Sequence, residues 1–255
     1  GLVMSDWGAV NDRVEGLKSG LDLEMPGDIG HNRQLILNAV KNGTLSMETV
    51  DKSVLRVLNM IYNTTLATEK VEDKFEEHAT LAKILSEDSA VLLKNENDIL
   101  PLGKKENYLV VGEMFENMRY QGAGSSLIRP YNLTTPKTAF DIHGIKYVYE
   151  RGYNVNSFDN DTALISKVLL KAQKFDKIIF FGGLSEYAES EGFDRKTLSL
   201  PQNQIELINR LARLGKKIIF VMFGGSPVEM DFEKNVDAIL NMYLPGQEGG
   251  EATYE

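Results

Sequence analysis

The fold is decided by an apolar run and the acidic loop that follows it: Lys177-Ile-Ile-Phe-Phe-Gly-Gly183, then Ser185-Glu-Tyr-Ala-Glu-Ser-Glu-Gly-Phe-Asp-Arg195. A short, uninterrupted apolar run is typical of a parallel strand that is covered on both faces. In an open α/β sheet, the loops that leave the carboxyl ends of such strands carry the functional site. This loop holds Glu186, Glu189 and Glu191. A carboxylate held in such a place can be tuned into a proton donor.

Apolar strands alternate with helices on both sides of this stretch. This alternation predicts a mostly parallel sheet with helices on both faces, an α/β domain over 79–255. Strands are expected at 90–93 (a buried strand), 108–112, 146–149, 178–181, 218–223 and 238–242. Helices are expected at 81–85, 138–142, 163–172 and 202–214.

A separate, smaller part is expected over residues 1–66. Its pattern reads as strand, helix, strand, helix, helix, with a turn at Pro26-Gly27 and an N-cap at Ser46. The last helix has helical spacing of apolar residues, which predicts a buried stripe of Val50, Val54, Val57, Leu58 and Ile61. The charged segment 67–78 is predicted to be a linker that becomes a helix, with a domain boundary there. The chain begins inside an expected strand and ends inside an expected helix, so we expect a section of a longer polypeptide, with the second domain truncated.

Composition narrows the class of protein. The chain has 255 residues, 42% of them hydrophobic and 25% charged, which is ordinary for a globular protein. The formal net charge of -9 argues against nucleic acid or an anionic membrane as partner. No apolar run reaches the roughly 20 residues that span a bilayer. A chain without cysteine fits a reducing compartment, and a cytoplasmic location is the weak expectation.

Several kinds of site lack their motifs. His31, His78 and His143 lie in unrelated elements with no metal-ligand spacing, so no metal site and no cofactor are expected. The serine-hydrolase motif GxSxG does not occur. The loop Gln121-Gly-Ala-Gly-Ser-Ser126 lacks the phosphate-binding patterns, so it is better read as a backbone-and-hydroxyl loop that lines a polyol site. Residues 224–229 are read as a structural turn.

The second candidate carboxylate is Asp6, at the end of the short strand Leu2-Val-Met-Ser5. An Asp after a strand often only caps the next turn. Here it precedes Trp7, the single tryptophan of the chain, and an aromatic plane beside a carboxylate suits a sugar ring, whose C–H face can stack on it. Two carboxylates at two strand ends raise the prospect of two-carboxylate sugar chemistry.

The acidic loop also has a plain alternative, since acidic loops are commonly just solvated and Asp194-Arg195 could be a surface ion pair of little energy. Its Gly192, Phe193 and closing Leu198-Ser-Leu-Pro201 run indicate an ordered loop. Glu189 competes with Glu191 for any catalytic role. For contacts with a substrate we select Trp7, Glu189, Phe193 and Arg195.

Seven motifs in order along the chain resemble glycoside hydrolase family 3, the β-glucosidase group. They are 3–8 (VMSDWG), 20–27 (GLDLEMPG), 90–95 with 100–102 (AVLLKN, LPL), 120–126 (YQGAGSS), 189–195 with 200–201 (ESEGFDR, LP), 224–229 (GGSPVE) and 244–251 (LPGQEGGE). The resemblance implies an (α/β)6-type sandwich preceded by the last strands and helices of a (β/α)8-type barrel. It also implies a retaining β-glycosidase with the site between the two domains.

The resemblance assigns roles to two residues. Asp6 corresponds to the family's nucleophile and Glu191 to its acid/base, and the expected substrate is a β-glucoside or oligosaccharide with a terminal glucosyl residue. A complete barrel takes about 250 residues, so we expect the remaining barrel segment in the same or a second chain. The 255-residue chain alone could be inactive.

Other readings stay open. A β-xylosidase or α-L-arabinofuranosidase of the same family is the runner-up, and a non-catalytic carbohydrate-binding fragment is an alternative from another class. A branch that acts on N-acetylglucosaminides usually lacks the second domain and fits less well. A homo-oligomer is left open.

Overall fold

The computed structural model describes residues 1–28, 30–66, 72–103 and 106–255. The chain divides into two compact units, Gly1–Asp73 and Lys74–Glu255, and each is described here by itself. Residues 67–71 of the predicted linker 67–78 lie outside the described residues, and its last part already belongs to helix α4 (Phe75–Ser89). That helix is therefore longer than the expected 81–85.

The second unit is built on one six-stranded sheet with the order β3-β8-β7-β6-β4-β5. All neighbouring strands run parallel except β3 and β8, which are antiparallel. The strands are β3 (Val91–Asn95), β4 (Asn107–Val111), β5 (Lys146–Glu150), β6 (Lys177–Gly183), β7 (Lys217–Phe223) and β8 (Ala238–Tyr243). The mostly parallel α/β sheet predicted from the sequence is confirmed.

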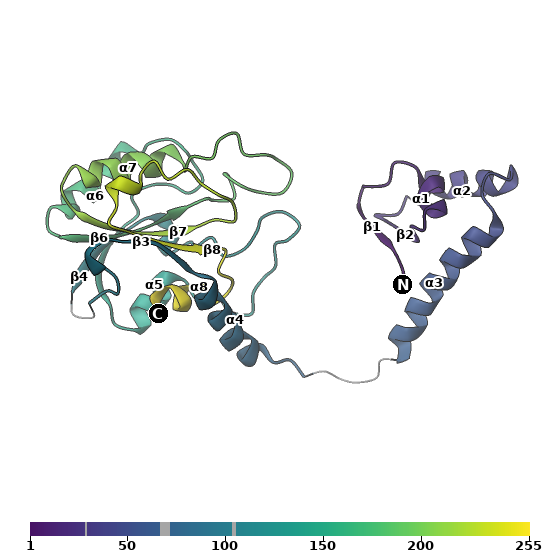
Figure 1. Cartoon of the computed structure of the whole chain (residues 1–255), viewed down its shortest axis with the longest axis horizontal. Helices are drawn as coiled ribbons and strands as arrows, with labels where there is room; N and C mark the ends of the chain where they lie inside the picture. The colour runs from purple at the N-terminus through teal and green to yellow at the C-terminus, as the bar shows by residue number, and fades with distance from the viewer. Residues whose placement is uncertain (29, 67–71, 104–105) are drawn as a thin grey trace. The chain divides into compact units, whose positions relative to one another are not determined.

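Helices cover both faces of this sheet. One face carries α6 (Thr162–Ala172) and α7 (Gln202–Ala212), and the other carries α4, α5 (Pro136–Ile142) and α8 (Gly249–Tyr254), as Figure 1 shows. Because side chains alternate along a strand, β6 contributes Ile178 and Phe180 to the core under α6 and α7, and Ile179 and Phe181 to the opposite core. The apolar run is continuous because both of its faces are buried.

Two of the covering helices have local start signals in the sequence. Asp161 precedes α6, and its carboxylate accepts from the N–H groups of Ala163 and Leu164 at 2.9 and 3.0 Å. Thr135 caps α5 in the same way through Thr138 N–H, with Pro136 in the first turn. Three short 3₁₀ turns complete the unit, at Glu96–Asp98, Glu113–Phe115 and Glu233–Asn235.

The expectation of a buried strand at 90–93 is wrong in one respect. The strand exists, but it is the edge strand β3, and its side chains are exposed by 38% at Val91, 50% at Leu92 and 49% at Leu93. An edge strand has a neighbour on one side only, here β8, so its apolar side chains receive less cover than those of a central strand.

The first unit holds a parallel pair of short strands, β1 (Met4–Trp7) and β2 (Leu23–Met25). Its helices are α1 (Arg13–Lys18), α2 (His31–Lys41) and α3 (Met47–Leu66). Ser46 caps α3 by accepting from Thr49 N–H at 3.2 Å, as predicted. The buried core is small and contains Leu17, Ala39 and Leu45.

The buried stripe predicted on α3 is wrong. Val50 and Val57 are half-buried, but Val54, Leu58 and Ile61 are exposed. Within the first unit, α3 has contacts with α1, and two short strands and three helices supply too little surface to cover a 20-residue helix. The apolar spacing is that of a buried helix, although the described residues of this unit do not bury it.

An ion pair joins the base of β1 to α3. The carboxylate of Asp22 is fully buried and accepts a bidentate pair of bonds from Arg56, 2.9 Å to Nε and 2.7 Å to Nη2, and a third bond from Val3 N–H at 3.0 Å. The Arg56 guanidinium holds the pKa of Asp22 far below its ordinary value. The strand that ends in Asp6 is therefore anchored at its start.

Candidate active site

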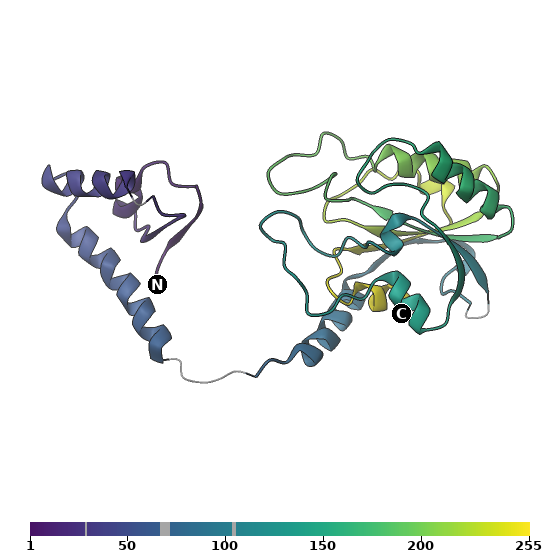
Figure 2. The ribbon, with the colours of Figure 1, turned by 180° about the vertical axis from the view of Figure 1, so that it is seen from behind.

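Three long loops leave neighbouring strands at the carboxyl edge of the sheet. They follow β4, β6 and β7, which adjoin one another in the sheet. Figures 1 and 2 show the loop after β4 in teal and the loop after β6 in green extending from the same edge. Gly183 ends β6 with φ +136°, and a Cβ there would overlap the carbonyl oxygen of Phe223. Only glycine lets these two strand ends approach so closely.

Glu191 lies at the tip of a tight turn within the loop after β6. An isolated antiparallel bridge joins Ser190 to Phe193, which leaves Glu191 and Gly192 as the two residues between them. Gly192 has φ +92°, a conformation that other residues rarely adopt. The Gly that follows Glu191 in the sequence is thus required by the turn that presents the carboxylate.

The carboxylate of Glu191 contacts the loop that follows β4. Ser125 donates to Oε2 twice, from its backbone N–H and from its hydroxyl, each at 2.5 Å. A Cβ on Gly124 would lie 2.5 Å from the same oxygen, so glycine is also needed for this approach. The Gly-Ser loop predicted to line a polyol site therefore holds the candidate acid/base.

These contacts change the acidity of Glu191. The hydrogen bond from the Ser125 hydroxyl, and next the bond from its N–H, lower the pKa of the Glu191 carboxyl below its ordinary value. In this arrangement Glu191 is ionised, which is the form of a general base. A proton donor at neutral pH needs the opposite shift.

Glu189 has a different environment, although it lies only two residues away. Its side chain is 11% exposed, and both of its oxygens accept hydrogen bonds from the turn after β7. Gly225 N–H donates to Oε1 at 2.6 Å, and the Ser226 hydroxyl donates to Oε2. Both oxygens of Glu189 therefore already have protein donors, whereas Glu191 is exposed.

The other two residues selected in this loop differ in exposure, since Phe193 is exposed and Arg195 is half-buried. Phe193 is 51% exposed and closes the turn through its backbone bridge to Ser190. Arg195 donates from Nη1 to the carbonyl oxygen of Pro227 at 2.8 Å. The ring of Phe193 is therefore accessible, and Arg195 is tied to the loop after β7.

Asp6 and Trp7 lie in the first unit, at the end of β1. Trp7 N–H donates to Asp6 Oδ1 at 2.6 Å, and Gly8 N–H donates to the carbonyl oxygen of Met25 at 2.9 Å. Asp6 is exposed, and the Trp7 ring is 62% exposed. Ser5 accepts from Met25 N–H at 2.8 Å, which fixes β1 beside β2 just before the Asp.

The second unit thus brings Glu189, Glu191, Phe193 and Arg195 together in one loop, while Asp6 and Trp7 belong to the other unit. Sequence reasoning missed the partners of the two glutamates. The sequence places Ser125 only in a loop that lines a polyol site and Ser226 only in a structural turn, and buried Arg119 is not among the selected residues. The available signal was their position, since all three follow parallel strands and so reach the same edge of the sheet.

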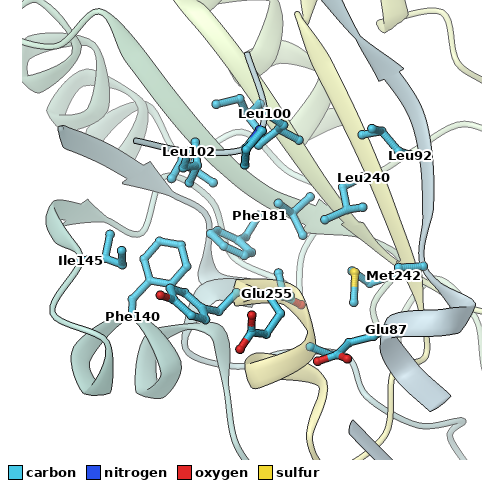
Figure 3. Close-up of a pocket in the computed structure, with 18 of the residues that line it drawn as sticks. Glu87, Leu92, Leu100, Leu102, Phe140, Ile145, Phe181, Leu240, Met242 and Glu255 are labelled. Carbon is cyan, nitrogen blue, oxygen red and sulfur yellow. The ribbon is translucent and has the colours of Figure 1, made fainter. Parts of the chain in front are cut away.

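A cavity of about 620 Å³ lies elsewhere, on the face of the sheet near α4, α5 and α8. Figure 3 shows apolar side chains around it, with Glu87 and Glu255 among its polar groups. It has none of the six predicted site residues in its lining. This apolar cavity differs from the exposed, polar loop edge that holds Glu191.

Residues 1–28, 30–66, 72–103 and 106–255 contain no group of three or more His, Asp or Glu side chains arranged to hold a metal ion. Over the same ranges, no helix combines the length and hydropathy needed to cross a membrane.

The amino-acid sequence of this chain matches a known protein family and several characterised relatives. Residues 90–255 match the model of the glycosyl hydrolase family 3 C-terminal domain. The thermostable beta-glucosidase B of Acetivibrio thermocellus is 40% identical over an alignment of 257 positions, which covers 99% of this chain and 34% of that protein. The exo-alpha-(1->6)-L-arabinopyranosidase of Bifidobacterium breve is 34% identical over 99% of this chain and 35% of its own length.

Solved structures agree with the sequence matches. The crystal structure of a GH3 beta-glucosidase from Bifidobacterium adolescentis has a TM-score of 0.89 and 34% identity, over 99% of this chain and 37% of that one. The chain spans about a third of the length of the relatives that it matches. On the family match and on the fold, the chain belongs to glycosyl hydrolase family 3.

Proposed function

We propose that the chain carries both catalytic carboxylates of a retaining β-glucosidase that removes terminal, non-reducing β-linked glucosyl residues. The observation that carries the proposal is the placement of Glu191, an exposed carboxylate at the tip of a tight turn on the carboxyl edge of the sheet. The 40% identity to a beta-glucosidase supports glucose as the sugar.

The proposed reaction has two steps. Asp6 attacks the anomeric carbon and forms a glycosyl ester while Glu191 protonates the leaving oxygen, and then water, deprotonated by Glu191, hydrolyses the ester. Retention requires about 5–5.5 Å between the two carboxyl groups. The exposed Trp7 ring suits stacking against the sugar, and Phe193 and Arg195 border the acid/base.

The hydrogen bonds from Ser125 set a condition on this mechanism. They favour ionised Glu191, so they fit the second step, in which Glu191 is the base. For the first step Glu191 must be protonated. Its carboxyl group must therefore separate from Ser125, or a negative charge such as the Asp6 carboxylate must come close and raise its pKa. We propose that substrate entry separates Glu191 from Ser125.

The proposed partner is the barrel segment that the expected family architecture requires. The chain covers about a third of its relatives, and α3 exposes an apolar face. We propose that this segment, in the same or a second chain, completes the barrel against the first unit. It would supply the remaining contacts to the sugar hydroxyls.

Mutation of the two carboxylates tests the proposal. In the chain assembled with its barrel segment, Asp6→Asn and Glu191→Gln should each lower kcat/KM for phenyl β-glucoside by about 10²–10⁴-fold. Glu186→Gln is the matched control, because Glu186 is an exposed carboxylate of the same loop with no hydrogen bond to the described residues. Unchanged hydrolysis in either of the first two variants removes that residue from its role.

The same protein separates the alternatives. A 2-deoxy-2-fluoro-β-glucoside should trap a covalent adduct on the peptide that contains Asp6, which mass spectrometry detects. Faster hydrolysis of a β-xyloside or an α-L-arabinofuranoside would assign another sugar. The relative from Bifidobacterium breve is named for an arabinopyranoside, so the sugar varies among relatives. Oligosaccharide binding without hydrolysis would instead support the carbohydrate-binding alternative.

A further inference from the structure

A buried guanidinium links two of the loops at the carboxyl edge. Arg119 follows β4 and is 7% exposed. Its Nε donates to the carbonyl oxygen of Gln121 at 2.7 Å, and its Nη2 donates to the carbonyl oxygen of Glu189 at 3.3 Å. The first acceptor begins the Gly-Ser loop, and the second lies two residues before Glu191. One side chain therefore holds the backbone of both loops whose tips meet at the Glu191–Ser125 contact.

The carboxylate of Glu189 extends this link to the third loop. It accepts from Gly225 N–H at 2.6 Å and from the Ser226 hydroxyl, both in the turn after β7. It also lies 4.0 Å from Nη2 of Arg119, at an almost fully covered position. We call Arg119, Glu189, Gly225 and Ser226 the loop clamp. Its members come from the segments after three adjacent strands, β4, β6 and β7.

We propose that Arg119 and Glu189 are positioning residues, which act on the reaction by fixing where Glu191 stands. This inference rests on the proposed function of Glu191 as acid/base. Glu189 does not touch the sugar in this scheme, since both of its oxygens already accept protein hydrogen bonds.

The effect of the clamp should be confined to proton transfer at Glu191. Glu189 immediately precedes the turn that carries Glu191 and is separated from Glu191 by one residue, so loosening the first allows the second to shift. A misplacement of about 1 Å at a reacting group can cost about 10²-fold in rate. Substrates whose leaving group needs no protonation should escape this loss.

The decisive comparison is Glu189→Ala against Glu189→Gln. Glutamine keeps an acceptor for Gly225 N–H and offers an amide donor to the Ser226 oxygen, whereas alanine removes both bonds. In the chain assembled with its barrel segment, alanine should lower kcat/KM for phenyl β-glucoside by about 10²-fold. Glutamine should remain within about tenfold of the unmodified protein, because neutral hydrogen bonds replace charge-assisted ones.

Substrates with different leaving groups show whether Glu189 positions Glu191, only maintains the fold, or takes part in the reaction directly. The loss in Glu189→Ala should be large for phenyl and small for 2,4-dinitrophenyl β-glucoside, and Ser226→Ala should show the same trend more weakly. Lys196→Ala is the control in the same loop, at an exposed position. Equal losses on both substrates would mean general damage to the fold, and glutamine as harmful as alanine would mean that the charge itself is used. Either result overturns the proposal, as does an unaffected Glu189→Ala variant.

A measurement without activity tests the clamp independently. Hydrogen exchange in Glu189→Ala should speed up for the backbone N–H groups of 185–195 and 224–226, while strand β5 stays protected. Unchanged exchange in those loops refutes the clamp even if the enzyme is active. If the unmodified protein cleaves no glycoside, or Glu191→Ala has no effect, the proposed function fails while the exchange result still stands.

Discussion

At the scale of single residues, two glutamates in one loop have different surroundings. The oxygens of Glu189 accept from Gly225 and Ser226, whereas Glu191 is exposed and accepts from Ser125 alone among the described residues. A carboxylate with hydrogen-bond donors to both of its oxygens is suited to holding loops. An exposed carboxylate with one polar neighbour is free to exchange that neighbour for a substrate.

This difference predicts the effect of removing the Ser125 hydroxyl. Because that hydroxyl is the largest cause of the lowered pKa of Glu191, Ser125→Ala should raise this pKa towards its ordinary value of 4.5. A ¹³C NMR titration of the Glu191 carboxyl group measures it. Where hydrolysis depends on protonated Glu191, the basic limb of the kcat/KM profile should move to higher pH in the same variant.

The sign of the stability effect follows from the same shift. A carboxyl whose pKa is lower in the folded state stabilises that state above the unfolded pKa, and this contribution is lost as pH falls through the folded pKa.

Ser126→Ala is the control for the pKa measurement, because its hydroxyl contacts the carbonyl oxygen of Ala123 and not Glu191. An unchanged or lower pKa of Glu191 in Ser125→Ala would contradict the prediction.

The sequence predicts that the candidate carboxylates lie at or after the ends of strands, but it does not predict which residues donate hydrogen bonds to them. The positions of Glu191 and Asp6 after apolar runs predicted loop and strand-end sites, and the structure places both there. Ser125 and Ser226 lie 66 and 37 residues from the glutamates that they contact, so no local pattern connects them. The catalytic roles of Asp6 and Glu191 stay predictions.

At the scale of elements, the close approach of strand ends gives a prediction about glycine. Gly183→Ala places a Cβ against the Phe223 backbone at φ +136° and should lower the free energy of unfolding by more than about 3 kcal/mol. Urea denaturation of the chain measures this. The mutation also moves the start of the loop that carries Glu191, so activity should fall with stability.

The control is a glycine whose positive φ would strain another residue but whose Cβ would overlap no neighbouring atom. Gly215 has φ +68° and open space where a Cβ would lie, so Gly215→Ala should cost only about 1 kcal/mol. Similar losses in the two variants would mean that the backbone contact at Gly183 contributes little.

Most element boundaries were predictable within a few residues because the apolar runs and helical spacings are strong, but α4 (Phe75–Ser89) begins well before the expected 81–85. Burial was less predictable. An apolar run such as 91–93 has the same appearance in an edge strand as in a central one, since only the pairing partners differ. The spacing on α3 likewise shows that a face is apolar, not what covers it.

At the scale of the whole molecule, the exposed face of α3 predicts behaviour of the chain in isolation. Leu55, Leu58 and Ile61 are all exposed on this helix, and large exposed apolar patches mark interaction sites or promote association. The chain alone should bind a hydrophobic dye and associate with increasing concentration, as measured by fluorescence and sedimentation. Adding the barrel segment should reduce both.

A double substitution on α3 tests whether its exposed apolar residues cause the dye binding and the association. Leu58→Gln with Ile61→Gln should reduce dye binding and association while α3 stays helical, because glutamine is a good helix former. Lys52→Gln on the same helix is the control, at an exposed and already polar position. A monodisperse chain that binds no dye would contradict the prediction.

The position of β3 has a consequence for biosynthesis. Leu92 is paired with Leu240, and β8 is the sole strand beside β3 in the sheet. A ribosome adds about 5–20 residues per second, so β3 emerges roughly seven to thirty seconds before its partner exists. During that interval β3 has no strand partner, and this edge of the sheet pairs only after β8 has been synthesised.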